Sequence, residues 1–304
     1  MKPSIQRLPA AQIDVAKWDH CVQQHSNGLL YSTTTYLNTL CPNWAGLVIN
    51  DYEAILALPN KKKWGIRYVY TPPFIQQLGI IGNTAAVDTA DLLKMIKETV
   101  AYADIHFNFS NASLLSEVAV TSRTNLVISL DQPLVQIRAQ YTNDLKENIR
   151  KATSQALVYT AAGLYEAIDH FQNQYAARMK QILPSDYANF LRLCEQLQTS
   201  GQCFIRAVTS VEKDLLAIAL FLKDDRRIYN LMNTTLPAGR DREANHFLLD
   251  SVIAEFAGQA LLFDLEGSEL PGVKKFYTSF GAMHQPYFHY HYNGLPWPLR
   301  LLKR

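Results

Sequence analysis

Two acidic side chains, Asp264 and Glu266, lie two positions apart in the segment Phe263–Gly267. Residues at this spacing in a strand point to the same face. A carboxylate at the end of a strand, beside a pocket, can orient or deprotonate an attacking amine. The alternative for both side chains is an ion pair or a helix cap. We expect Glu266 to be the better candidate for a general base, because strand ends open to solvent.

His289 and His291 alternate with aromatic residues in the segment Tyr287–Tyr292, a pattern that is typical of a strand. Two histidines on one face could bind a metal ion. No carboxylate or cysteine at ligand spacing accompanies them in the sequence. We therefore expect a half-exposed aromatic strand here, and no metal cofactor.

Polar and aromatic residues after a predicted strand in the first half form a second candidate surface. Tyr70 and Phe74 flank a Pro-Pro break, and Gln76 and Gln77 follow. An aromatic corner with paired amides is unusual in an ordinary loop, so we predict that these four residues line a substrate. In the second half, Lys146, Arg150 and Lys151 give a predicted helix a basic face, which either binds a phosphate group of the acceptor or is simply solvated.

The elements that would position these residues occur twice along the chain. The first set comprises strands at Ala45–Asn50, Ala54–Pro59 and Ile66–Tyr70, a helix over Ala90–Tyr102 and a strand over Ile105–Phe109. The second set comprises strands at Cys203–Thr209, Leu215–Leu222 and Ile228–Asn233, a helix capped by Asp241 and ending near Gly258, and a strand over Leu261–Leu265. Tyr68 and Tyr229 are 161 residues apart, and Ile105 and Leu262 are 157 apart. These similar offsets predict a duplicated α+β unit.

Each predicted unit opens with helices. The first has Ile13–Gln24 and Ser32–Leu40, and the second has Thr142–Ser154, Leu164–Met179 and Ser185–Leu197. A strand over Leu126–Leu130 precedes the break Asp131–Pro133, so we predict domains at 1–132 and 133–304.

The composition is that of a globular protein, with 304 residues, 48% of them hydrophobic and 18% charged. A net charge of +2 is too balanced for a protein that coats nucleic acid. The longest apolar run, Leu215–Leu222, is too short to cross a bilayer, and no signal peptide is recognised. Four cysteines at unrelated spacings predict reduced, buried thiols of a cytoplasmic protein. The sequence contains no nucleophile elbow, Walker sequence or dinucleotide fingerprint, which counts against serine hydrolases, P-loop enzymes and Rossmann enzymes.

Four segments in order resemble the FemABX-type and FemAB-like acyltransferases, which contain two tandem GNAT units. They are Trp18-Asp19 with Leu30-Tyr31-Ser32 and Tyr36-Leu37, Tyr141 with Asn148–Ala152, Phe263–Ser268, and Gly272–Gly281 with Phe276 and Phe280-Gly281. The resemblance spans nearly the whole chain. It implies an α+β fold of two GNAT-like units, each a mixed, mostly antiparallel sheet flanked by helices.

The resemblance also implies N-acyl or aminoacyl transfer to an amine acceptor, either a small molecule or a cell-envelope precursor. Acyl-CoA or aminoacyl-tRNA would be the donor. Tyr277 stands where the family helix has a lysine that is thought to stabilise charge, and Tyr277 can donate a hydrogen bond but carries no positive charge at neutral pH. This difference, with the absence of the long helical arm of some members, weakens the tRNA-dependent assignment. It leaves a non-catalytic descendant that binds a ligand or partner as the alternative.

In GNAT folds, a glycine-rich turn before a helix holds the donor's pyrophosphate on backbone N–H groups. The resemblance places this role on Gly239, Arg240 and Arg242, although Asp241 would compete with a phosphate. A plain turn is the alternative. In the first unit, the resemblance places the segment after Tyr70 at the border of the acceptor cleft.

Overall fold

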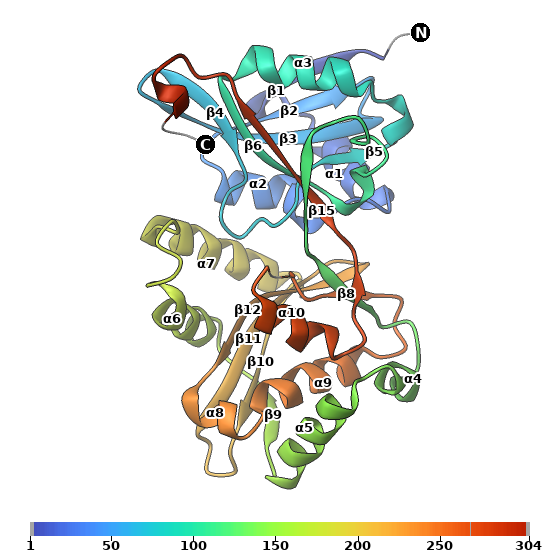
Figure 1. Ribbon diagram of the computed structural model, residues 1–304, viewed down its shortest axis with the longest axis vertical. Coiled ribbons are helices and arrows are strands. Elements are labelled where there is room, and N and C mark those ends of the chain that lie inside the picture. Colours follow the sequence, from blue (N-terminus) through green and yellow to red (C-terminus); the bar gives the residue numbers. More distant parts are fainter. Residues whose placement is uncertain (1–2, 268, 302–304) are drawn as a thin grey trace. The chain divides into compact units, whose positions relative to one another are not determined.

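The computed structural model describes residues 3–267 and 269–301, which form two compact units. Unit 1 contains residues 3–123 and 286–301, and unit 2 contains residues 124–267 and 269–285. Each unit is a mixed, mostly antiparallel sheet flanked by helices (Figure 1), which confirms the predicted fold class. Ser268, the last residue of the predicted Phe263–Ser268 motif, lies outside the described residues.

The sheet of unit 1 has the strand order β1-β2-β3-β4-β6-β15-β7, and β5 also pairs with β3. Its strands are β1 (Ile5–Pro9), β2 (Trp44–Ile49), β3 (Ala54–Lys63), β4 (Ile66–Tyr70), β5 (Ile80–Gly82), β6 (Tyr102–Phe107), β7 (Val120–Arg123) and β15 (Tyr287–Asn293). Strand β2 is buried along its whole length, as expected for a strand covered on both faces. The repeated strand pattern predicted β2, β3, β4 and β6, whereas β1, β5 and β7 were not predicted.

Three helices flank this sheet: α1 (Val15–Gln24), α2 (Thr34–Leu40) and α3 (Thr89–Thr99). Each begins at a polar side chain that accepts a backbone N–H, namely Asp14, Thr33 and Asp88. Helix α3 buries Leu92, Leu93 and Ile96 in the core of unit 1. These caps and the helical spacing of the apolar residues fix where the helices start and which face they bury.

The sheet of unit 2 has the order β14-β8-β13-β12-β11-β10-β9. Its strands are β8 (Leu126–Ser129), β9 (Val158–Ala161), β10 (Cys203–Thr209), β11 (Leu215–Lys223), β12 (Arg227–Thr235), β13 (Leu262–Asp264) and β14 (Met283–His284). The helices are α4 (Leu134–Ala139), α5 (Asn143–Ser154), α6 (Leu164–Tyr175), α7 (Pro184–Thr199), α8 (Pro237–Asp241), α9 (Ala244–Phe256) and α10 (Pro271–Thr278). Helix α6 packs on β11 and β12, whereas α9 packs on β10 and β11 and is covered in turn by α5.

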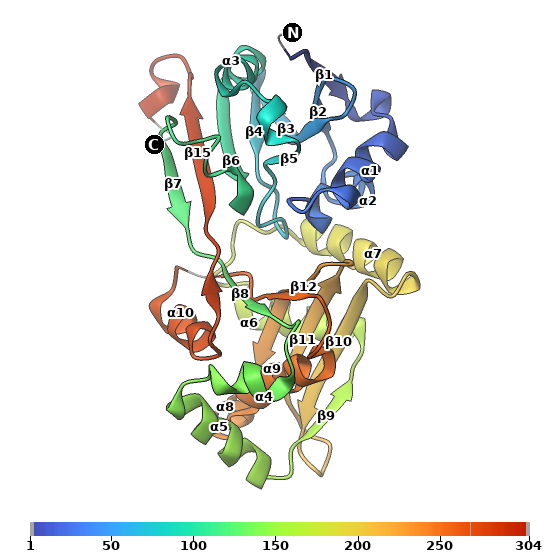
Figure 2. The same cartoon turned by 90° about the vertical axis from the view of Figure 1, so that its right-hand side faces the viewer.

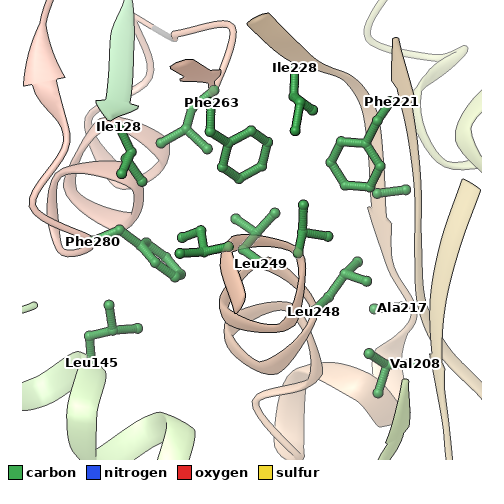
Figure 3. Close-up of a cluster of buried hydrophobic side chains, with 14 of the residues drawn as sticks. Ile128, Leu145, Val208, Ala217, Phe221, Ile228, Leu248, Leu249, Phe263 and Phe280 are labelled. Atoms are coloured by element: carbon green, nitrogen blue, oxygen red, sulfur yellow. The ribbon is translucent and has the colours of Figure 1, made fainter. Parts of the chain in front are cut away.

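The core of unit 2 lies between α9 and the sheet (Figure 3). Leu248 and Leu249 of α9 meet Phe221 of β11 and Phe263 of β13, and all four side chains are almost completely buried. Burying a side chain of this size stabilises the fold by about 1.5–3 kcal/mol relative to leaving it in water. This core fixes β12 and β13, the strands that carry the candidate site.

The two units repeat one topology. In unit 1, β2, β3 and β4 form an antiparallel meander, α3 follows, and β6 returns parallel to β4. In unit 2, β10, β11, β12, α9 and β13 follow the same order, and β13 is parallel to β12. The duplicated pattern in the sequence is thus a duplicated architecture.

The closing strands are exchanged between the two copies. Strand β8, which ends the first copy along the chain, pairs with β13 in unit 2. Strand β15, which ends the second copy, pairs with β6 and β7 in unit 1, as Figure 2 shows. The compact units therefore differ from the predicted domains 1–132 and 133–304. The prediction followed the order of the repeat, whereas antiparallel pairing is decided by which sheet edge each strand completes.

The start of helix α9 differs from the prediction that Asp241 caps it. Asp241 ends the short helix α8, and Glu243 precedes α9 with a left-handed backbone angle φ of 55°. In unit 2, Pro237 supplies the first residue of α8, because its fixed backbone angle suits a helix start.

All four cysteines (Cys21, Cys41, Cys194 and Cys203) are free and buried, as predicted. Across residues 3–267 and 269–301, no helix combines the length and apolar character that a membrane crossing requires.

Gly239 gives a test of this packing. A Cβ atom at Gly239 would lie 2.0 Å from the carbonyl oxygen of Leu216 on β11, whereas a Cβ at Gly272 would meet nothing within 4 Å. We expect Gly239→Ala to lower the free energy of unfolding by about 1–3 kcal/mol, the usual cost of overpacking. The matched variant Gly272→Ala should leave it unchanged or slightly higher. Equal urea denaturation midpoints for the two variants would contradict the close contact.

Candidate active site

Strand β12 separates from β13 partway along its length. Their parallel pairing covers three residues of each strand and stops at the pair Tyr229 and Asp264. Within the described part of the chain, β12 continues past Tyr229 with no further pairing to β13. On its other edge, β12 shifts register against β11, so that Leu231 is the extra residue of a β-bulge. In the described residues, one edge of β12 beyond Tyr229 therefore has no pairing to β13, and the bulge interrupts the regular pairing on its other edge.

Asp264 is buried at the point where the strands part. Its Oδ2 accepts hydrogen bonds from Arg227 and, at 3.2 Å, from Nδ2 of Asn125. Its Oδ1 accepts the backbone N–H of Glu266 at 2.9 Å. Arg227 and Asp264 are only 4% and 1% exposed, and Arg227 also donates to Gln285 at 3.0 Å. These contacts favour a positioning role for Asp264 over the predicted catalytic one, because its carboxylate already holds the strand end and the Glu266 backbone.

Glu266 occupies a strained turn directly after β13. Its backbone has φ of 59°, in the left-handed region that only a few per cent of residues other than glycine adopt. Gly267 follows with φ of 41°, and a Cβ there would lie 2.1 Å from the carbonyl oxygen of Thr124. Burial raises the pKa of Glu266 to about 8. A carboxyl group with this pKa can exchange a proton near neutral pH, as a general base must.

Tyr277 of helix α10 lies close to Glu266. Its hydroxyl oxygen accepts a hydrogen bond from Nδ2 of Asn230 on β12 at 3.3 Å. Burial, followed by the neighbouring Tyr175 and Glu266, raises the pKa of Tyr277 well above its usual value. Tyr277 therefore keeps its proton throughout the physiological range and can act as a hydrogen-bond donor. Four elements contribute to this cluster: β12, the turn after β13, α10 and, through Tyr175, helix α6.

Polar atoms without partners accumulate on the strand and helix beside this cluster. Among the described residues, Oδ1 of Asn230, Nδ2 of Asn233, Oγ1 of Thr234 and Oδ1 of Asn245 are buried and have no hydrogen-bond partner. A buried polar group without a partner costs about 1–3 kcal/mol, so such groups in one region indicate a ligand or water site. Asn230, Asn233 and Tyr175 were not predicted from the sequence. The run of polar side chains in an otherwise apolar central strand was the signal that could have found the first two.

A cavity of about 400 Å³ lies at the end of β12, beside the start of α9. Its lining includes Tyr175, Arg178, Arg240, Glu243 and His246. Nδ1 of His246 lies 3.0 Å from the Glu243 carboxylate, and burial lowers the pKa of His246. Arg178 and Arg240 supply positive charge for an anionic group. The Glu243 carboxylate, however, lies at the N-terminal end of α9, where a phosphate would otherwise bind.

The predicted phosphate turn is thus brought to the cavity only in part. Arg240 and Gly239 both line the cavity. Gly239 is also packed against the backbone of Leu216, and this contact leaves no room for a side chain. Arg242 is not among the lining residues, and its charge instead acts on Glu212 in the turn between β10 and β11. Arg178 was not predicted, because it reaches this cavity from the end of α6, far away in the sequence.

The three basic residues of α5 have different surroundings. Lys151 donates to Glu243 at 3.2 Å, so it neutralises the acidic residue beside the cavity. Arg150 pairs with Glu147 one turn earlier on the same helix and is mostly exposed. Arg150 and Lys146 also line a separate, wide hollow of about 920 Å³ beside α9.

The predicted substrate-lining residues of unit 1 have different surroundings. Tyr70 lines a cavity of about 400 Å³, and Nζ of Lys61 lies 4.5 Å from the centre of its ring. Gln77 is completely buried, and its side chain accepts the backbone N–H of Phe109 at 3.1 Å, so it stabilises the loop and cannot line a substrate.

Phe74 and Gln76 complete that loop. The backbone carbonyl of Phe74 accepts the hydroxyl of Tyr36, and the carbonyl of Gln76 lies 3.0 Å from Nδ1 of His106. Phe74 has φ of 62°, a strained backbone that the sequence did not indicate.

Two lysines lie near Tyr277 on α10. Nζ of Lys274 lies 3.5 Å from the Thr124 hydroxyl oxygen, and Lys275 is exposed. The expectation that no carboxylate accompanies His289 and His291 is wrong, because β6 places Asp104 beside them. The carboxylate comes from a strand about 185 residues away, so spacing along the sequence could not show it.

The buried pair Arg227–Asp264 predicts a large stability loss. We expect Asp264→Asn to lower the free energy of unfolding by about 3–5 kcal/mol, because it leaves the Arg227 charge buried without a counter-ion. The exposed pair Arg150–Glu147 supplies the control, and Glu147→Gln should cost no more than about 1 kcal/mol. Equal losses in urea denaturation would show that the buried pair is not needed.

The raised pKa of Glu266 predicts a pH dependence of stability. From the ordinary value of 4.5 up to about 8, the folded state holds a proton that the unfolded state has lost. The free energy of unfolding therefore falls as pH rises through this window. Glu266→Gln removes this loss of stability. The Tm of Glu266→Gln minus the wild-type Tm should therefore be at least about 3 °C larger at about pH 9 than at about pH 5. Exposed Glu166→Gln is the control, and a Tm difference for Glu266→Gln that stays constant with pH would contradict the burial of this carboxyl group.

Comparison with known proteins gives an independent view of the fold. The model of the family described as "Acetyltransferase (GNAT) domain" matches residues 139–270, which include β12, β13 and Glu266. No curated protein sequence matches the chain.

Several solved structures match over almost their entire length. FemX superimposes with a TM-score of 0.68 at 15% identity, covering 98% of this chain and 99% of FemX. A conserved protein of unknown function from Bacteroides thetaiotaomicron gives 0.59 at 12% identity, covering 91% of this chain and 97% of that one. L-PGS from Bacillus licheniformis gives 0.55 at 12% identity, covering 95% of each chain. The chain therefore has a fold of two tandem GNAT-like units, similar to that of FemX.

Proposed function

We propose that this protein is an acyltransferase that moves an acyl group from an activated donor to an amine. The observation that carries the proposal is the proximity of Glu266, in the turn after β13, and Tyr277, on α10. One group has a pKa near 8 and can accept a proton, and the other stays protonated and can donate a hydrogen bond. The strained turn at Glu266 supports a functional role, because such strain is concentrated at active sites.

The chemistry that these groups support is nucleophilic attack by a neutral amine on a thioester or ester carbonyl. A C–N bond forms while the Glu266 carboxylate accepts a proton from the nitrogen. Tyr277 and backbone N–H groups of β12 would donate hydrogen bonds to the negatively charged oxygen of the tetrahedral intermediate. The C–S or C–O bond then breaks, and the leaving sulfur or oxygen takes the proton back from Glu266. Asp264 would act as a positioning residue, because it holds the Glu266 backbone.

The donor would enter by the cavity that Arg178 and Arg240 line. Acyl-CoA and aminoacyl-tRNA both carry phosphate groups, which these two guanidinium groups suit. Gly239 and Arg242 contribute through the fold and the charge of this turn. The acidic Glu243, neutralised in part by Lys151, makes the cavity less positive than a strong phosphate site.

The acceptor side of the proposal rests on unit 1 and on the basic face of α5. Tyr70, with Phe74 and Gln76 in the loop after it, would contact the amine acceptor, a small molecule or a cell-envelope precursor. Arg150 and Lys151 would meet a phosphate on a larger acceptor. We also propose a cytoplasmic location, which the free, buried cysteines support because disulfides are common in oxidising compartments.

Radiolabelled acetyl-CoA and charged tRNA, each offered with a panel of amines, test the proposal. With the donor that reacts, kcat/KM should rise as pH increases through about 8, because Glu266 must be ionised. Glu266→Gln and Tyr277→Phe should each lower transfer at least about 100-fold while donor affinity stays within about twofold. Glu166→Gln and Tyr165→Phe, two neighbouring exposed positions on α6, are the matched controls.

A chain that binds neither donor would not be an acyltransferase of this kind. The alternative is a descendant of the fold that binds a ligand or a partner without catalysis, which the replacement of the family lysine by Tyr277 favours. In that case Glu266→Ala and Tyr277→Phe would leave the cellular phenotype of the wild type intact.

A further inference from the structure

A second cluster of chemistry-bearing side chains lies in unit 1, where β15 and β6 pair. The antiparallel register places His291 opposite Asp104 and His289 opposite His106. His289 and His291 share one face of β15 because they are two residues apart. Directly opposite residues of an antiparallel pair have Cβ atoms about 4.5–5.5 Å apart. Two imidazoles and a carboxylate thus converge on one face of the sheet.

The ligating atoms of Asp104, His289 and His291 all lie within 4.8 Å of one another. Oδ1 of Asp104 already contacts Nε2 of His289. Zinc binds imidazole nitrogen at about 2.0–2.1 Å and carboxylate oxygen at about 2.0–2.2 Å, so ligand atoms around one ion lie roughly 3–3.5 Å apart. Small side-chain rotations would bring the three atoms to that spacing.

Neighbouring groups hold this triad in place. The Tyr102 hydroxyl is hydrogen-bonded to Asp104, and the Tyr102 ring lies edge-on to His291 with centroids 5.2 Å apart. The His106 ring packs edge-on against His289 at 5.2 Å. Metal ligands in proteins are usually oriented by such outer partners. The carboxylate and the ring are therefore fixed from outside the triad.

Asp104 also faces a cavity. The hollow of about 400 Å³ that Tyr70 lines includes Asp104, Tyr68, Tyr102 and Leu295. The Asp104 side chain is 41% exposed and that of His289 18% exposed, so an ion could enter from solvent. An ion with three protein ligands keeps a coordination position for water or a substrate group, in contrast to a closed structural site with four.

We propose that Asp104, His289 and His291 bind a divalent transition-metal ion with an open coordination position toward this aromatic cavity. Two imidazoles and one carboxylate suit zinc and also match the ligand set of non-haem iron(II) sites. The open position would take water or an anionic oxygen, such as a carboxylate or phosphate of a ligand in the cavity. The inference does not depend on the proposed transfer activity, since none of the three ligands belongs to the Glu266 and Tyr277 cluster.

Metal binding to the full chain, after dialysis against a chelator, tests the proposal. Titration calorimetry should give one Zn²⁺ per chain, and cobalt(II) should give visible d–d absorption that zinc displaces. A parallel titration with iron(II) under anaerobic conditions tells which ion is preferred. His291→Ala and Asp104→Asn should each weaken Zn²⁺ binding at least about 100-fold, more than outer partners usually contribute.

His284→Ala removes an exposed histidine of unit 2 and should leave the affinity unchanged. The Tm of each metal-free variant shows whether it folds. His291 is exposed, so its truncation should leave the metal-free Tm within about 2 °C of the wild type. Absence of stoichiometric Zn²⁺ binding to the wild type would overturn the proposal. Wild-type Zn²⁺ affinity in the folded variants His291→Ala and Asp104→Asn would overturn it as well.

Discussion

The buried ion pair between Arg227 and Asp264 is the constraint on which unit 2 depends. It joins Arg227, the first residue of β12, to Asp264, the last residue of β13, and Asn125 completes it from the segment that leads into β8. A buried pair of charges is costly unless every oxygen and N–H is used, and here the remaining carboxylate oxygen holds the Glu266 backbone. The requirement to satisfy one buried carboxylate thus also positions the candidate base.

The irregular surroundings of this pair follow from the strands themselves. Strand β13 is short, β12 is long and bulged at Leu231, and the close approach of Gly267 to Thr124 turns the chain sharply at Glu266. Buried side-chain polar atoms of Asn230, Asn233 and Thr234, all on β12, have no hydrogen-bond partner among the described residues. Such a desolvation cost on one strand is the behaviour of a binding site and not of a sheet optimised for stability.

The exchange of β8 and β15 has a second consequence. Strand β15 carries its two histidines into unit 1, where β6 supplies Asp104, so the cluster combines residues from opposite ends of the sequence. Had β15 stayed in the sheet of its own copy, this combination would not exist. A closing strand completes whichever sheet edge it pairs with, and it takes its side chains to that sheet.

The sequence by itself determined the elements and their repetition. The alternating residues of β10, the continuous apolar run of β11, the helical spacing in α3 and α5, and the offsets near 160 residues are local or periodic signals, so they could be recognised without a structure. The local pattern likewise placed Asp264 on a strand, but the expected shared face with Glu266 is wrong, because β13 ends at Asp264 and Glu266 lies in the turn after it. The resemblance placed Tyr277 on the following helix.

Only the tertiary structure decided which of these residues meet and in what state. It paired Asp264 with Arg227, surrounded Glu266 so that its pKa rises, buried Gln77 in a loop and joined Asp104 to His289. These outcomes depend on contacts between residues tens to hundreds of positions apart, and on desolvation, which acts only once a core has formed. Residue types and spacing therefore identified candidates for chemistry, whereas burial and strand pairing assigned their roles.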